Sequence, residues 1–399
     1  MKPKIRFSSS NILYEEKTLS EISTINPKTI VPLEFEYVDL ESVSGTEMTS
    51  HRTEHKATAP SRAQRLAKKG DIFYQTVRPY QKNNYYFDMD DDNYVFSTGY
   101  AQIRPSIYGK YLFTLLQNDS FLKQVLDNCA GTSFPAINPS VLSRLSVRIC
   151  TDKQEQQAIA SYFTSLDSQI SVSTSRLASL KQMKTASLQA MFPQEGETVP
   201  KIRFKGFEGE WKKVKLGDIA KFTKGQGYSK SDLKETGQPI ILYGRMYTKY
   251  QFVIDEVDTF ANLKDASILS EGDEIIMPAS GETPEDIACA SAVLAKDIIL
   301  GGDLNIMHFD LTKISTPYIA LVITYSKTHH DLSKCAQGKS VVHLHNGAIS
   351  RATISLPSLA EQQAIASYFT SLDRQISLQS QRLEKLKQIK SACLDKMFV

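Results

Sequence analysis

The sequence predicts a mixed α/β protein in which two globular domains are joined by two long helices. Three observations support this fold class: a 38-residue stretch occurs twice, each copy carries a seam of apolar residues, and a dissimilar segment of alternating strand and helix character precedes each copy. Two copies of one unit within a chain tend to pair about a two-fold axis. We therefore expect antiparallel, coiled-coil-like helices with pseudo-two-fold symmetry.

The repeated stretch covers Glu155–Phe192 and Glu361–Phe398. The copies agree at 26 of 38 positions, and their first 13 residues, EQQAIASYFTSLD, are identical. Neither copy contains Gly or Pro, and apolar residues recur mostly at steps of three and four, which predicts a helix with a narrow apolar seam. The seam residues are Ile159, Phe163, Leu166, Ile170, Leu177, Leu180 and Leu188, and Ile365, Phe369, Leu372, Ile376, Leu383, Leu386 and Leu394. Such a seam needs a partner, and the nearest candidate is the other copy.

Shorter matches extend the repeat beyond the helices. Pro3–Phe7 and Pro200–Phe204 both read PKIRF, and Leu19–Ile22 resembles Leu216–Ile219. The chain is therefore a tandem duplication. We divide it into a first globular domain (1–152), a central helix (153–192), a linker (193–200), a second globular domain (201–358) and a C-terminal helix (359–399).

Each globular domain is expected to combine several strands with one late helix. Segments rich in β-branched and aromatic residues predict strands at Ile30–Val43, Asp71–Val77, Tyr94–Ile103, Pro239–Met246, Glu274–Met277 and Asn305–Leu311. Helical spacing that ends before a glycine predicts late helices over Tyr108–Cys129 and Pro317–Gln337. A last strand, Leu145–Ile149 or Ala352–Leu356, should lead into each long helix.

Composition and short motifs narrow the possible functions. A net charge of +3 with 41% hydrophobic and 23% charged residues is ordinary for a globular protein, so any surface for nucleic acid must be a local patch. Five scattered cysteines without a CxxC pair argue against disulfides and zinc, and no apolar run could span a bilayer, so we expect a cytoplasmic protein. Gly225-Gln-Gly227 is a lone GxG, too little for a phosphate loop. We expect no catalytic residue, metal or cofactor in this chain.

The order of these parts resembles a known family. A variable domain, an EQ-x-x-I helix, a second variable domain and a second EQ-x-x-I helix follow one another, with RFKGFEGEWKKVKLGDIA opening the second domain and ISLPSLAEQQAI closing it. This order is similar to that of the specificity subunit of type I restriction-modification enzymes, over essentially the whole chain. One departure is that RICTDKQEQQ, in the first copy, lacks the proline of SLPSLAEQQ in the second.

The resemblance implies a non-catalytic DNA-specificity subunit whose two target recognition domains each read one half of an asymmetric, bipartite site in double-stranded DNA. A 38-residue helix is about 57 Å long and could set the gap between the half-sites. The expected partners are two modification (methyltransferase) subunits docked on the helices and two restriction (translocase and nuclease) subunits. S-adenosylmethionine, ATP and Mg²⁺ are expected to belong to these partners. Two alternatives stay open: a self-contained nuclease or methyltransferase, and a coiled-coil scaffold without nucleic acid.

Candidate DNA-contacting residues lie in polar loops that mix cations, amides and aromatic rings. In the first domain they are Arg78, Tyr80, Gln81, Lys82, Asn83, Asn84, Tyr85, Thr132 and Ser133. In the second domain they are Lys224, Gln226, Tyr228, Lys230, Arg245, Lys249, Lys339, Ser340, His343, His345 and Asn346. For any one of them the alternative is a polar loop residue that only contacts water.

Overall fold

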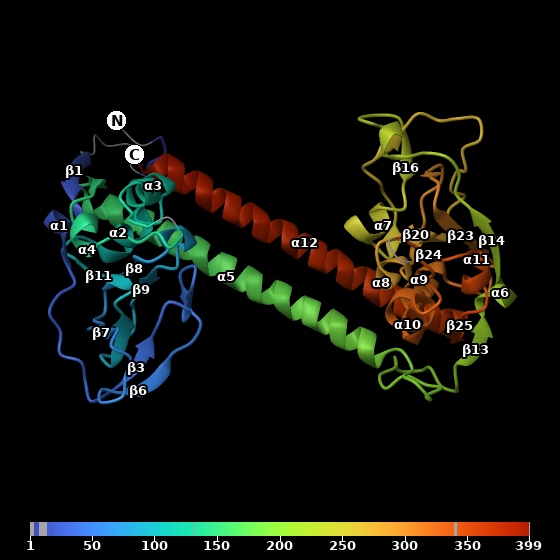
Figure 1. Ribbon diagram of the computed structural model, residues 1–399, viewed down its shortest axis with the longest axis horizontal. Coiled ribbons are helices and arrows are strands. Elements are labelled where there is room, and N and C mark those ends of the chain that lie inside the picture. Colours follow the sequence, from blue (N-terminus) through green and yellow to red (C-terminus); the bar gives the residue numbers. More distant parts are fainter. Residues whose placement is uncertain (1–3, 8–13, 132, 339–340, 399) are drawn as a thin grey trace. The chain divides into compact units, whose positions relative to one another are not determined.

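The computed structural model describes residues 4–7, 14–131, 133–338 and 341–398 (Figure 1). Its contacts divide the chain into two compact units. Unit 1 comprises residues up to Thr174 together with those from Gln381 onward, and unit 2 comprises Ser175–Ser380. Each unit therefore holds one globular part, the beginning of one long helix and the end of the other.

The described strands of unit 1 form two four-stranded sheets and two short two-stranded pairs. One sheet has the order β2-β11-β8-β9 and is antiparallel throughout, whereas in the other, β6-β3-β10-β7, strands β3 and β10 are parallel. In one pair, β1 is antiparallel to β12, the strand that leads into the long helix. The strands are β1 (Tyr14–Thr18), β2 (Ser23–Ile25), β3 (Glu34–Val38), β4 (Val43–Ser44), β5 (Glu47–Met48), β6 (Arg52–His55), β7 (Ala63–Leu66), β8 (Ile72–Gln75), β9 (Tyr85–Tyr86), β10 (Tyr94–Ser97), β11 (Tyr100–Pro105) and β12 (Ser146–Cys150).

The prediction of a single helix over Tyr108–Cys129 is wrong, because two shorter helices occupy this range. The structure has α2 (Gly109–Leu115) and α3 (Asp119–Asp127). Between them Asn118 has an extended backbone, and its side-chain oxygen accepts a hydrogen bond of 2.7 Å from the backbone N–H of Ser120. An asparagine placed in this way caps a new helix instead of continuing the previous one. The shorter helices of unit 1 are α1 (Leu19–Ile22), η1 (Pro79–Gln81) and α4 (Pro139–Leu142).

Unit 2 repeats this plan with one more strand among its described residues. Its first strand, β13, is antiparallel to β25, which leads into the second long helix. The sheets have the orders β14-β23-β19-β21-β17 and β15-β18-β16-β22, and β20 pairs with β24. The strands are β13 (Lys212–Lys215), β14 (Ala220–Lys224), β15 (Leu233–Lys234), β16 (Gln238–Ile241), β17 (Val253–Ile254), β18 (Phe260–Ala261), β19 (Glu274–Pro278), β20 (Ser280–Gly281), β21 (Ser291–Val293), β22 (Ile299–Leu300), β23 (Leu304–Phe309), β24 (Val342–His343) and β25 (Thr353–Leu356).

Two predictions for unit 2 are corrected. The strand expected over Pro239–Met246 ends at Ile241, and the residues after it form the helical turn α7 (Arg245–Thr248), which buries Met246. The expected helix over Pro317–Gln337 is divided into α9 (Thr316–Tyr325) and α10 (Lys327–Ser333). At the break, Ser326 is extended and its hydroxyl oxygen accepts a hydrogen bond of 3.2 Å from the N–H of Thr328, as a helix cap does. The remaining short helices are α6 (Leu216–Ile219), η2 (Lys230–Asp232), α8 (Pro284–Ile287) and α11 (Asn346–Ile349).

The two repeated stretches form the long helices α5 (Lys153–Ala190) and α12 (Leu359–Met397). All fourteen predicted seam residues are buried or half-buried. In unit 1 the seam packs into the domain core, where the rings of Phe163 and Phe398 lie 6.2 Å apart. In unit 2 the equivalent rings of Phe369 and Phe192 lie 6.3 Å apart. None of the described helices combines the length and the apolar character needed to cross a membrane.

Within each unit the two helix segments are antiparallel and make the same contacts. In unit 1 the hydroxyl of Tyr162 lies 3.4 Å from the Cys393 sulfur, and Asp167 forms an ion pair of 2.5 Å with Lys390. In unit 2 the hydroxyl of Tyr368 lies 2.8 Å from that of Ser187, and Asp373 forms an ion pair of 2.6 Å with Lys184. Tyr368 and Asp373 of α12 occupy the same positions in their repeat as Tyr162 and Asp167 of α5 occupy in theirs. The internal contacts of the two units thus have the relation that pseudo-two-fold symmetry requires.

The PKIRF motif packs against the start of a long helix in both units. The ring of Phe7 lies 5.6 Å from that of Tyr162, and the ring of Phe204 lies 5.8 Å from that of Tyr368. Glu361, the first residue of its repeat, is buried and accepts two hydrogen bonds of 2.7 Å from the guanidinium of Arg203. The PKIRF motif and the start of the helix repeat therefore pack against each other in each unit.

Candidate nucleic-acid interface

In each unit the loop after the late helix, which the sequence singled out, lies beside a second loop. In unit 1 the loop after β8 meets the loop after α3 through a bridge between Val77 and Ala136. In unit 2, β20 pairs with β24, placing Ser280 opposite His343. The supporting hydrogen bonds match, since the N–H of Ile137 donates to the Thr76 carbonyl and that of Leu344 donates to the Ala279 carbonyl, each at 3.0 Å. We call residues 77–84 with 133–136 the first loop pair, and residues 279–283 with 341–346 the second loop pair.

The first loop pair presents a cation and two aromatic rings. The guanidinium carbon of Arg78 lies 4.5 Å from the centre of the Phe134 ring. Phe134 is 61% exposed and Tyr80 is 50% exposed. Ser133 is also exposed, whereas Thr132 lies outside the described residues. Phe134 was missed in the sequence, because nothing local distinguishes this phenylalanine from a core residue.

The other candidates in this loop hold it in place. The carbonyl oxygen of the Asn84 side chain, which is 3% exposed, accepts a hydrogen bond of 2.8 Å from the N–H of Gln75. The Gln75 side chain in turn donates to Gln81 at 2.8 Å. The Asn83 side chain accepts from the N–H of Gly45 at 2.9 Å.

Two further candidates of the first domain have partners within the protein. The Lys82 ammonium forms an ion pair with Asp119 and donates to the carbonyl of Gln117 at 3.2 Å. Tyr85 is half-buried, with its ring stacked 5.9 Å from that of Phe96. Both side chains therefore support the loop through contacts within the unit, whereas Tyr80 and Ser133 are exposed and Arg78 is half-buried.

The second loop pair gathers histidines. The rings of His343 and His345 are parallel, with centres 6.2 Å apart, and both residues are exposed. His343 Nδ1 lies 3.2 Å from the Ser280 hydroxyl. The Asn346 amide donates to the carbonyl of Thr223 on β14 at 3.1 Å, which brings this strand and the exposed Lys224 beside the loop pair. Lys339 and Ser340 lie outside the described residues.

Several cations of the second domain are already neutralised. Arg245 and Lys249 both form ion pairs with Asp258, at 2.5 Å in the case of Arg245. Hydrogen bonds from Lys249 and Arg245 hold the pKa of the Asp258 carboxyl well below its usual range. Tyr228 is half-buried, and its hydroxyl donates to the carbonyl of Asn262 at 3.1 Å. Of the remaining candidates in this domain, Lys224, Gln226 and Lys230 are exposed.

The lone GxG has a packing role. A Cβ placed on Gly225 would lie 1.9 Å from the carbonyl oxygen of Gly301, closer than any real contact allows. The N–H of Gly302 also donates to the carbonyl of Gly227 at 2.6 Å. These glycines let two backbone segments approach each other, which accounts for the motif without a phosphate.

A buried carboxyl lies at the start of the strand that leads into the second loop pair. Glu274 is 2% exposed, and desolvation raises its pKa to about 7 despite opposing backbone hydrogen bonds. In unit 1 the equivalent Asp71 forms an ion pair of 2.8 Å with Arg104 and accepts a hydrogen bond of 2.7 Å from Gln102. Strand pairing places His308 where unit 1 has Arg104, and that ring lies against the hydroxyl of Thr223 on β14. Glu274 thus lacks the partners that stabilise Asp71.

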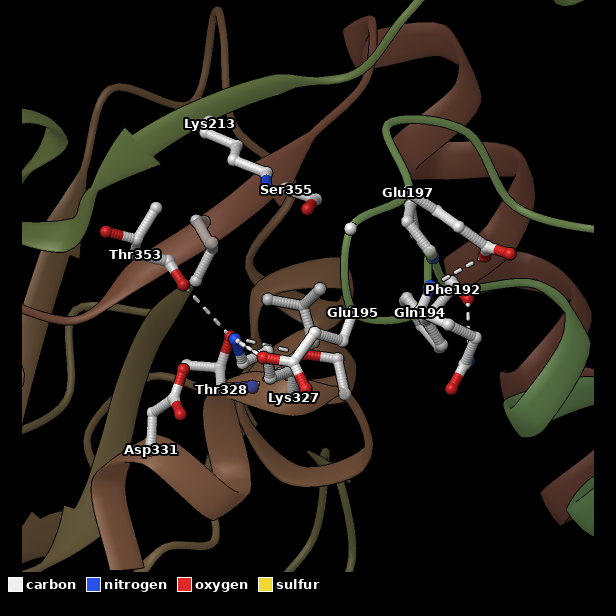
Figure 2. Close-up of a pocket in the computed structure, with 15 residues that line it drawn as sticks. Phe192, Gln194, Glu195, Glu197, Lys213, Lys327, Thr328, Asp331, Thr353 and Ser355 are labelled. Atoms are coloured by element: carbon white, nitrogen blue, oxygen red, sulfur yellow. Dashed lines mark hydrogen bonds and ion pairs between the residues drawn. The ribbon is translucent and has the colours of Figure 1, made fainter. Parts of the chain in front are cut away.

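A small pocket of about 120 Å³ in unit 2 lies between the linker, α10 and β25 (Figure 2). Glu195 of the linker forms an ion pair of 2.8 Å with Lys327, and the Thr328 hydroxyl donates to the Thr353 carbonyl at 3.2 Å. The linker also folds on itself, because the N–H of Gln194 donates to Glu197 at 2.9 Å. The pocket therefore lies where the linker is anchored to α10. Across the described residues, no group of three or more His, Cys, Asp or Glu side chains could hold a metal ion.

The chain is similar to several known proteins. Residues 11–182 and 208–388 each match the family model of the type I restriction modification DNA specificity domain. A stretch of 139 residues is 34% identical to the type I restriction enzyme HindI specificity subunit of Haemophilus influenzae, covering 33% of this chain and only 30% of that subunit. The type I restriction enzyme MjaVIII specificity subunit of Methanocaldococcus jannaschii is 21% identical over 342 residues, covering 83% of this chain and 74% of that one.

A solved structure shares the fold. It is the crystal structure of the type I restriction-modification system S subunit from M. genitalium, which superposes with a TM-score of 0.64. The match is 15% identical in sequence and covers 100% of this chain and 99% of that chain.

Proposed function

Since the chain belongs to the family of type I restriction modification DNA specificity domains, we propose that each of its globular parts reads one half of an asymmetric, two-part target in double-stranded DNA. The observation that carries this proposal is the presence of one loop pair in each unit, held by matching backbone hydrogen bonds. Two loop pairs in one chain, one in each unit, match a target that has two half-sites. Exposed loops on a rigid scaffold are also where recognition residues concentrate.

The half-sites should differ because the two loop pairs carry different chemistry. The first loop pair presents Arg78 with two aromatic rings, and the second presents two histidines. Hydrogen-bonding groups and apolar groups select different bases in the major groove. An asymmetric site follows from this difference.

The long helices are proposed to set the gap between the half-sites and to dock the modification subunits. Their seam faces inward, yet apolar side chains at equivalent repeat positions are exposed on the outside. Val172 is 65% and Leu378 is 56% exposed, and Met183 is 51% and Ile389 is 38% exposed. Repeated exposed apolar side chains support a protein-binding surface, and their occurrence in both repeats supports two modification subunits.

The complete assembly would also include two restriction subunits. S-adenosylmethionine, ATP and Mg²⁺ would serve the partner chains, and this chain would be a non-catalytic subunit that recognises and positions DNA.

The proposal is tested by mapping methylated bases in cells that express this chain with its modification subunits. We expect one asymmetric motif made of two short specified parts separated by a fixed unspecified gap. Replacing this chain by a variant in which residues 77–84 are exchanged for another sequence should change one part of the motif only. A continuous methylated motif, or methylation of DNA by this chain alone, would contradict the proposal.

A further inference from the structure

We propose that Arg78, stacked on the ring of Phe134, is the residue of unit 1 that reads a guanine in its half-site. The inference rests on the proposed function, because it assigns one base contact to one of the two loop pairs. It also selects one arginine from many polar loop residues and names the base that this arginine recognises.

The backbone at Arg78 is held in an unusual conformation. Arg78 has φ of 54° and Lys82 has φ of 55°, so a left-handed residue that is not glycine lies on each side of η1. Such residues cost free energy and persist only where the surroundings enforce them, most often at binding sites. Here the N–H of Arg78 donates to the carbonyl of Pro135 at 2.8 Å, and its own carbonyl accepts from Gln81 at 3.0 Å. The arginine is therefore placed by the fold before any ligand arrives.

The guanidinium is positioned but has no partner. Its carbon lies 4.5 Å from the centre of the exposed Phe134 ring. A guanidinium that lies over an aromatic ring can keep the N–H donors at its edge available. In the described part of the chain no carboxylate or other acceptor bonds to these donors. Lys82, Arg245 and Lys249 differ in this respect, since each forms an ion pair with a carboxylate.

A guanine edge matches these free donors. The O6 and N7 atoms of guanine accept two parallel hydrogen bonds from one guanidinium in the major groove. A phosphate could accept the same donors, but the apolar surroundings favour a base. Phe134 beside the guanidinium and Tyr80 two residues further along the loop both expose large aromatic surfaces, and such surfaces gain more from contact with a base than from contact with a charged oxygen.

Unit 2 lacks this arrangement. The matching bridges put Gly281 at the position of Arg78, and Val341 at the position of Phe134. Gly281 has no side chain to donate hydrogen bonds, and valine offers no ring to stack on. The guanine contact is therefore expected in one half-site only, and the second half-site serves as an internal reference.

The test uses the complex of this chain with its modification subunits and measures equilibrium binding in competition. The probes are duplexes that carry the mapped two-part site with each base pair replaced in turn, together with one unrelated duplex. The variants are Arg78→Lys, Arg78→Ala and Phe134→Ala, with Val341→Ala as the matched control. Phe134→Ala truncates an exposed side chain, so it is expected to fold even if Arg78→Ala does not.

We expect Arg78→Ala to lower the preference for a single G·C pair by about 5- to 150-fold, the range for one bidentate base contact. Arg78→Lys, which keeps the charge but loses the planar pair of donors, should lower the same preference by less. Its affinity for the unrelated duplex and its preferences in the other half-site should stay within about twofold. Phe134→Ala should weaken the preference for the same pair, and Val341→Ala should leave it unchanged. The inference is overturned if the Arg78 variants weaken all duplexes equally, which indicates a phosphate contact, or if the affected pair is not G·C. If the unaltered complex prefers no two-part site, the proposed function itself is wrong.

Discussion

Replacing Glu274 by glutamine should stabilise unit 2 at neutral and alkaline pH. The carboxyl is 2% exposed, and its Oε2 atom has no hydrogen-bond partner among the described residues. Its Oε1 accepts from the N–H of Glu271 at 3.0 Å, a bond that a glutamine oxygen can keep. The pKa is raised from 4.5 to about 7, so the folded protein holds a proton that the unfolded chain has lost.

The sign of the pH dependence follows from this difference. Below about pH 4.5 both states are protonated and the group has no effect on stability. Between about pH 4.5 and 7 the unfolded chain ionises first, so the free energy of unfolding falls as pH rises. Above about pH 7 the free energy of unfolding falls no further on account of this group. The total decrease that corresponds to the shift of the Glu274 pKa is up to about 3 kcal/mol.

Urea unfolding followed by tryptophan fluorescence measures this effect in unit 2, because Trp211 is the single tryptophan of the chain and is buried there. Between pH 5 and pH 8 the advantage of Glu274→Gln over the unaltered protein should grow by up to about 3 kcal/mol. Glu235→Gln, which alters an exposed carboxyl elsewhere in unit 2, should leave the pH dependence intact. An advantage that stays constant across this pH range would refute the reasoning.

Two further changes test the loop and the helices. Asn84→Ala should lower the stability of unit 1 by about 1–3 kcal/mol, because the N–H of Gln75 loses its acceptor; faster hydrogen exchange at Gln75 should report this, and unchanged exchange would contradict it. Inserting four residues after both Ser175 and Gln381 lengthens each helix by about 6 Å, which equals one or two base pairs at about 3.4 Å each. Methylation mapping should then show a gap longer by that amount, and an unchanged gap would argue against the spacer role.

The long helices were the most predictable part of the fold. Helical periodicity and the absence of Gly and Pro are local properties, so α5 and α12 begin and end within two residues of the predicted bounds. The late helices were harder, because Asn118 and Ser326 are compatible with both a helix and a cap. In unit 1, Tyr111 before the break and Phe121 after it are both buried in the same core.

The candidate interface was only partly predictable. The sequence pointed to the loop after β8 and to the loops after the late helices, and in unit 1 the fold places two of these loops together. In unit 2 the loop after the late helix pairs with residues 280–281, which the sequence did not single out. The sequence could not show which side chains have partners inside the protein. Lys82 is paired with Asp119, and Arg245 with Asp258, both distant in sequence.

Two kinds of property thus have different origins in this protein. The duplication, the helical repeats and the family are apparent from the order of residues, because repeated motifs and helical spacing need no knowledge of distant contacts. The free or neutralised state of each loop cation depends on carboxylates that folding brings near. Arg78 stands out only once Phe134 lies beneath it, because that contact joins residues 56 positions apart and no local pattern in the sequence encodes it.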